Sequence, residues 1–94
     1  MTVIWLKLAM EDLKQLRNYI AKDNPIAANQ MASIILDKVE LLVDHPHIGK
    51  PGRLPNTREL VITGTPFVIP YRVIAQNVQI LRVFHSSQLW PKKL

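Results

Sequence analysis

The 94-residue sequence predicts a single α+β domain, residues 1–94, in which two N-terminal helices pack on one face of an antiparallel sheet. Apolar residues follow a helical period through the first half of the chain, whereas the second half holds runs rich in β-branched and aromatic residues. A segment with three prolines and two glycines, HPHIGKPGRLPN (45–56), separates the two halves and is expected to be a loop without regular structure. The expected order of elements is therefore β-α-α-β-β-β.

The first half is predicted to contain a short strand, TVIWL (2–6), followed by a helix from about Ala9. The segment KDNP ends this helix and starts the next, because Asn24 suits an N-cap and Pro25 suits the first helical position. So short a connection predicts an antiparallel helical hairpin. The apolar face of the first helix is formed by Ala9, Leu13, Leu16 and Ile20.

The second helix is expected to run from Pro25 to about Asp44. Ile34 and Leu41 widen its apolar surface beyond a single stripe, which predicts that a partner protein covers part of the hairpin. The stripe expected to face the core is formed by Ala28, Met31, Ile35, Val39 and Leu42.

The second half is predicted to form a three-stranded antiparallel meander from residues 57–64, 65–74 and 78–85. Gly64–Thr65 and the segment AQN (75–77) would form the two turns. Pro70 lies within the middle strand, where a proline requires a bulge or an unpaired position.

The strand pattern suggests a polar face on this sheet. If residues 75–77 close the hairpin, Tyr71 lies near Arg82 on one face, and Arg72 lies on the other. We expect the face with Tyr71 to be open and to present also Arg58 and, at its edge, His85. The alternative is that the arginines pair with Glu59 or with helix carboxylates; we expect this for Arg72, and both interpretations remain open for Arg82.

Charge and composition limit the chemistry. Residues 49–94 carry seven Lys or Arg and one acidic residue, so this half is suited to phosphate or to an acidic partner, although solubility alone would also explain it. The chain has no cysteine, no phosphate-loop glycine pattern and no pair of carboxylates in its basic half. His45 and His47 lack further metal ligands, so neither a metal nor a cofactor is expected. His85 is a possible general base, but a structural role is the simpler interpretation.

The whole chain resembles the ParE branch of the RelE/ParE toxin superfamily of bacterial type II toxin–antitoxin modules. The resemblance lies in five segments, of which the last is the most specific: AMEDLKQLRNYIAKDNPIAA (9–28), DHPHIGKPGR (44–53), TRELVI (57–62), PYRV (70–73) and VQILRVFHSSQLWP (78–91).

This resemblance implies a cytoplasmic toxin that arrests growth, takes part in plasmid or chromosomal stabilisation, and forms a hetero-oligomer with a cognate antitoxin. ParE-like members inhibit DNA gyrase, whereas RelE-like members cleave mRNA on the ribosome without a metal. The chain ends in LWPKKL, without the catalytic tyrosine and the dense set of basic residues of the RelE branch. A gyrase-binding toxin that is not an enzyme is therefore the leading interpretation, with an mRNA endonuclease as the alternative.

The site residues follow from this interpretation. A nuclease would rely on Arg58, Arg82 and His85, with added charge from Lys50 and Arg53. Trp90 is expected to anchor the C-terminal segment on the domain, with target binding as its alternative role. The residues expected to bind the target or the antitoxin are Arg53, Arg58, Tyr71, Arg82, His85, Trp90, Lys92 and Lys93.

Overall fold

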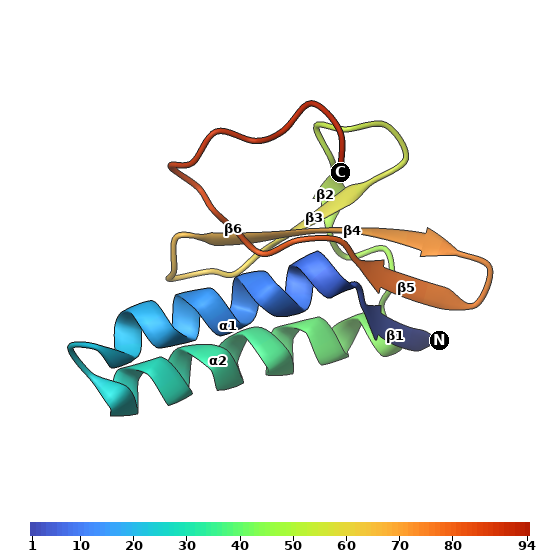
Figure 1. Cartoon of the computed structure of the whole chain (residues 1–94). Helices are drawn as coiled ribbons and strands as arrows, with labels where there is room; N and C mark the ends of the chain where they lie inside the picture. The colour runs from blue at the N-terminus through green and yellow to red at the C-terminus, as the bar shows by residue number, and fades with distance from the viewer.

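The computed structural model describes all 94 residues. Two antiparallel helices lie side by side against one face of a sheet, and the C-terminal segment arches over the opposite face (Figure 1). The elements are β1 (Thr2–Trp5), α1 (Lys7–Ala21), α2 (Pro25–Glu40), the 3₁₀ turn η1 (Leu41–Val43), β2 (Lys50–Pro51), β3 (Arg58–Val61), β4 (Phe67–Ile74), β5 (Asn77–Ile80) and β6 (Phe84–His85). The predicted α+β class and the predicted helical hairpin are confirmed.

The helical hairpin forms as its sequence predicts. The side chain of Asn24 accepts a hydrogen bond from the Ala27 backbone N–H at 3.0 Å, and Pro25 opens α2. α2 ends at Glu40, four residues before the expected end, because the chain tightens into η1. The buried core joins the two helices to the sheet through Ala9, Ile35, Val39, Leu42, Leu60, Ile62, Ile69, Tyr71, Val78, Ile80 and Val83. Neither helix is long and apolar enough to cross a membrane.

The sheet has the strand order β1-β5-β4-β3-β2, and β6 also pairs with β4. The meander of β3, β4 and β5 is antiparallel as predicted. β1 adds to its edge by pairing in parallel with β5, which places the start of α1 beside the end of β5. The expectation that residues 45–56 hold no regular element is wrong, because Lys50 and Pro51 pair with β3 as the short edge strand β2.

A β-bulge divides the last predicted strand into β5 and β6. Ile80 lies opposite Tyr71, and Phe84 lies opposite Val68. The segment from β5 to β6 therefore advances four residues where β4 advances three, which leaves one extra residue in the bulge. Pro70 lies beside the bulge, and its carbonyl accepts a hydrogen bond from the Leu81 backbone N–H at 3.0 Å. The bulge thus accommodates the proline within a central strand.

The predicted orientation of the sheet is wrong. Tyr71 is fully buried in the core beneath the helices, and Arg58, its partner across β3 and β4, lies on the same face. Tyr71 pairs with Ile80 instead of lying near Arg82. Arg72, on the next position of β4, is exposed on the face away from the helices, where its Nε donates to Gln79 at 2.8 Å instead of pairing with a carboxylate.

Candidate functional site

The C-terminal tail, which we define as residues 86–94, arches over the face of the sheet away from the helices (Figure 1). Phe84 is buried at the base of this layer, and the Trp90 ring packs on it with the ring centroids 4.7 Å apart. Trp90 therefore contacts the domain as an anchor of the tail. The Nε1 atom of Trp90 is buried without a hydrogen-bond acceptor, so the contact depends on the ring faces.

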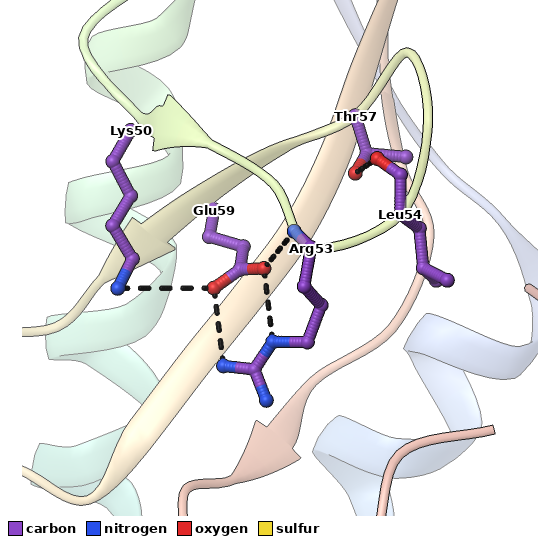
Figure 2. A network of polar contacts seen from close by, with 5 residues as sticks. All are labelled: Lys50, Arg53, Leu54, Thr57 and Glu59. Atoms are coloured by element: carbon purple, nitrogen blue, oxygen red, sulfur yellow. Dashed lines mark hydrogen bonds and ion pairs between the residues drawn. The ribbon is translucent and has the colours of Figure 1, made fainter. Parts of the chain in front are cut away.

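Glu59 is a buried carboxylate on this same face, with 2% of its side chain exposed. Figure 2 shows how Arg53 binds it at three points. The Arg53 backbone N–H donates at 2.8 Å, and its Nε and Nη2 atoms donate at 3.1 and 3.2 Å. Lys50 adds a second positive charge 4.0 Å away. The sequence suggests Glu59 only as a partner for strand arginines, whereas its partners in the structure are Arg53 of the loop and Lys50 of β2.

The ionisation of Glu59 reflects this environment. Burial raises the pKa of the carboxyl, but the hydrogen bonds from Arg53 and the charges of Arg53 and Lys50 outweigh that effect. The net result is a pKa below the ordinary value of 4.5. Glu59 is thus an ionised carboxylate that fixes the orientation of Arg53.

Arg53 links this carboxylate to the tail. Its guanidinium carbon lies 3.6 Å from the centroid of the Trp90 ring, on the ring face. A guanidinium held flat on an indole gains both stacking and cation–π attraction. Glu59, Arg53 and Trp90 together form a continuous contact from β3 to the tail, which we call the Glu59 clamp.

A groove of about 530 Å³ opens between the tail, the start of α1 and the loop after β2. Five cationic side chains line it, and no acidic side chain does: Lys7, Arg72, Arg82, Lys92 and Lys93. Leucines complete its walls: Leu6, Leu8, Leu54, Leu81 and Leu94. We call this the basic groove. Its lining suits a segment that carries carboxylates and aliphatic side chains together.

Arg82 is held by a helix carboxylate. Its Nε and Nη2 atoms donate to Asp12 of α1 at 2.7 and 3.0 Å, and the backbone N–H of Val83 donates to the same carboxylate at 3.0 Å. The hydrogen bonds that Arg82 donates to Asp12 raise the pKa of Arg82. The interpretation in which Arg82 stands on an open face of the sheet is wrong; 24% of its side chain is exposed. The alternative of pairing with a helix carboxylate is confirmed.

His85 is exposed at the end of β6, as expected. The backbone N–H of Ser87 donates to its Nδ1 at 3.1 Å, so Nδ1 carries the lone pair and the neutral ring carries its proton on Nε2. The Ser87 hydroxyl lies 2.6 Å from the same nitrogen. The sequence argument that neighbouring residues point apart missed this contact, because a turn brings Ser87 back onto the ring. No carboxylate contacts the ring, so the pair is not a catalytic triad.

Arg58 lies apart from Arg82 and His85. Its Nη1 donates to the carbonyls of His47 and Gly49 at 3.2 and 2.9 Å. It lines a separate hollow of about 330 Å³, whereas Arg82 and His85 share a groove between α1 and β6. The three residues proposed for a nuclease therefore do not converge on one position.

Tyr71 organises the loop next to Arg58. Its hydroxyl donates to the Pro46 carbonyl at 2.8 Å and accepts from the Gly49 N–H at 2.9 Å. A Cβ at Gly49 would lie 2.6 Å from the Tyr71 ring, so glycine is required for this approach. Burial raises the pKa of Tyr71 more than the Gly49 hydrogen bond and Arg58 lower it. No cluster of three or more His, Cys, Asp or Glu side chains that could hold a metal ion is present.

Comparison with known proteins identifies relatives along most of the chain. The family described as ParE toxin of type II toxin-antitoxin system, parDE, matches residues 3–90. Y4kP of Sinorhizobium fredii is 42% identical over 90 residues, which cover 96% of this chain and 93% of Y4kP. Toxin RelE2 of Caulobacter vibrioides is 34% identical over 87 residues, which cover 93% of this chain and 97% of that protein.

A solved structure shares the fold. A chain of the chromosomal ParDE TA system from P. aeruginosa superposes with a TM-score of 0.83 at 28% identity, over 90% of this chain and 95% of that one. The predicted resemblance to the RelE/ParE superfamily is thereby confirmed. The chain belongs to the ParE toxin family of type II toxin–antitoxin systems.

Proposed function

We propose that this chain is a toxin that arrests growth by binding a protein target, DNA gyrase, and that a cognate antitoxin neutralises it. The observation that supports binding over RNA cleavage is the arrangement of the candidate nuclease residues. Arg82 is paired with Asp12, Arg58 is bonded to backbone carbonyls, and the Nδ1 lone pair of His85 is occupied. An RNase that activates a 2′-OH needs a base and cations gathered around one phosphate.

The target surface that we propose is the tail together with the basic groove. Lys92 and Lys93 have no acidic partner within the chain, since the three ion pairs of the structure involve only Glu59 and Asp12 as acids. Unpaired cations beside leucines favour an acidic, partly apolar protein segment. Trp90 and Arg53 support this surface, whereas Tyr71 is buried and bonds to Pro46 and Gly49 of the loop before β2.

The antitoxin surface that we propose is the outer side of the helical hairpin. A groove of about 640 Å³ there is lined by Trp5, Met10, Leu13, Ala32 and Leu36 among others, and Met10 and Leu36 are exposed. A small domain that leaves such a groove between two helices offers a site for an amphipathic helix. The structurally similar chain comes from a chromosomal ParDE TA system, which supports an antitoxin as the partner.

The alternative function is mRNA cleavage on the ribosome. It is favoured by the shared groove of Arg82 and His85 and by the similarity to a protein named RelE2. Two assays on the purified or induced toxin decide between them. Inhibition of DNA supercoiling by purified gyrase, with no new mRNA ends in primer extension, is the expected result. Cuts within the ribosomal A site that disappear in Arg82→Ala would overturn the gyrase proposal.

A further inference from the structure

The tail has few attachments to the domain beyond its first turn. The Ser86 backbone N–H donates to the Pro66 carbonyl at 2.7 Å, and the Gln88 side chain accepts from the His85 backbone N–H at 2.8 Å. Among the hydrogen bonds of the structure, none involves residues 89–94. Leu89 is 96% exposed. The position of the last six residues therefore depends on how Trp90 is held.

Trp90 is held from two sides. Phe84, which is part of the buried layer, supports one side of its ring, and the Arg53 guanidinium lies 3.6 Å from the ring centroid. An arginine side chain samples many rotamers when nothing fixes it, which weakens any stacking contact. Here Glu59 binds Arg53 through one backbone and two side-chain hydrogen bonds, so the guanidinium is presented to the ring in one orientation.

The position of the tail determines the shape of the basic groove. Lys92 and Lys93 follow Trp90 by two and three residues, and the intervening Pro91 restricts the backbone. These lysines form one wall of the groove, and Arg72 and Arg82 on the sheet lie in the rest of its lining. If Trp90 left its place, the two lysines would no longer stand beside the two arginines.

We propose that Glu59, although too buried to contact another protein, is a positioning residue for target binding. Through Arg53 and Trp90 it fixes the tail so that the basic groove receives an extended acidic segment of the protein target. This inference rests on the proposed function, in which the tail and the groove meet the target. The chemistry of the occupant follows from the lining, which has five cations, several leucines and no acidic side chain.

The first test removes the charge of Glu59. In a Trp5→Phe background, Trp90 is the single tryptophan of the chain, so its emission reports on the tail. Glu59→Gln should shift this emission to longer wavelength and speed hydrogen exchange in residues 86–94, while circular dichroism stays that of a folded domain. Glu40→Gln, which removes a charge from an exposed position, is the matched control and should leave both signals unchanged.

The functional measurement is the toxin concentration that half-inhibits supercoiling by purified gyrase. Glu59→Gln should raise it roughly tenfold, the factor expected when one charge-assisted hydrogen bond no longer holds the binding surface in place. Growth after induction should recover in parallel. A released tail with unchanged growth arrest and unchanged gyrase inhibition would overturn the proposal, and so would a tail that stays docked in Glu59→Gln.

A second pair of variants covers the case in which Glu59→Gln fails to fold. Trp90→Ala removes the ring but leaves Glu59 and Arg53 paired, and should release the tail and weaken growth arrest. Trp90→Phe keeps an aromatic face for Arg53 and removes the unpaired Nε1–H, and should restore both hydrogen-exchange protection and toxicity. Equal effects of the two substitutions would show that the stacking contact does not position the tail.

The two proposals fail in different ways. If wild-type toxin does not inhibit gyrase, the proposed target is wrong, yet the emission and exchange measurements still decide whether Glu59 holds the tail. If wild-type toxin inhibits gyrase and the clamp variants do so equally well, the target stands and the positioning role is wrong.

Discussion

Asp12 and Arg82, 70 residues apart in the sequence, form a two-point ion pair that joins α1 to the β-bulge between β5 and β6. The bulge leaves the Val83 backbone N–H without a partner in β4, and Asp12 accepts that hydrogen bond as well. One carboxylate thus neutralises a strand arginine and satisfies a backbone donor. The contact fixes the position of the helical hairpin relative to the last strand.

The first prediction concerns the stability of this junction. Asp12→Ala should lower the free energy of unfolding by about 2–4 kcal/mol, because it leaves both Arg82 and the Val83 N–H without their acceptor. Arg82→Ala should cost less, because Asp12 keeps its bond to Val83. Urea denaturation followed by circular dichroism measures both values, with the exposed Asp37→Ala as control. Equal losses for the two variants would contradict the role assigned to Val83.

The second prediction concerns toxicity. Arg82→Ala should weaken growth arrest on induction, because Arg82 lines both the basic groove and the groove beside His85. The double variant His45→Ala with His47→Ala should arrest growth as wild type does, since both side chains are exposed in a loop. Asp12→Asn distinguishes an effect on stability from an effect on target binding. It weakens the ion pair with Arg82 but leaves the Arg82 cation in place, so this variant should stay toxic. Full toxicity of Arg82→Ala would place the target surface elsewhere.

The third prediction follows from the ionisation of Glu59. Its pKa in the folded chain lies below the ordinary value of 4.5, so the ionised carboxylate stabilises the folded state. This stabilisation is fully present above that value and is lost as the pH falls through the folded-state pKa. The stability difference between wild type and Glu59→Gln should therefore shrink as the pH is lowered from about 6 to about 3.

Denaturation of both proteins at each pH measures that difference, and other carboxyl groups cancel because both chains share them. A difference that stays constant with pH would mean that Arg53 and Lys50 do not lower the pKa of Glu59.

Much of the fold could be predicted from local signals. The Asn24–Pro25 helix start, the two helical apolar faces and the antiparallel meander all depend on residues close in sequence. The parallel pairing of β1 with β5 could not be predicted in the same way, because it joins segments far apart in the chain and has no turn to mark it.

Which face of the sheet packs on the helices could not be predicted for a different reason. In β4, Ile69, Tyr71 and Val73 alternate with Val68, Pro70, Arg72 and Ile74, so apolar residues predominate on both faces and the alternation alone does not show which face packs on the helices. The polar hydroxyl of Tyr71 does not indicate an open face, because it bonds to loop groups while the ring fills the core. The Glu59 clamp was missed because it joins a strand, a loop and the tail. A lone acid in a basic half was its only signal in the sequence.

The last prediction concerns the antitoxin. Leu36 is 46% exposed and lines the groove between α1 and α2, where we propose that an amphipathic helix docks. Leu36→Glu should leave folding and growth arrest intact, because this face lies away from the basic groove. It should weaken neutralisation by the antitoxin about tenfold or more, because the complex would bury an unpaired charge.

Ile26→Glu, which is on the same helix outside that groove and is 71% exposed, is the matched control. Growth during co-expression with the antitoxin and titration of the purified pair measure the effect. Neutralisation of Leu36→Glu at wild-type antitoxin levels would show that the antitoxin binds another face of the toxin.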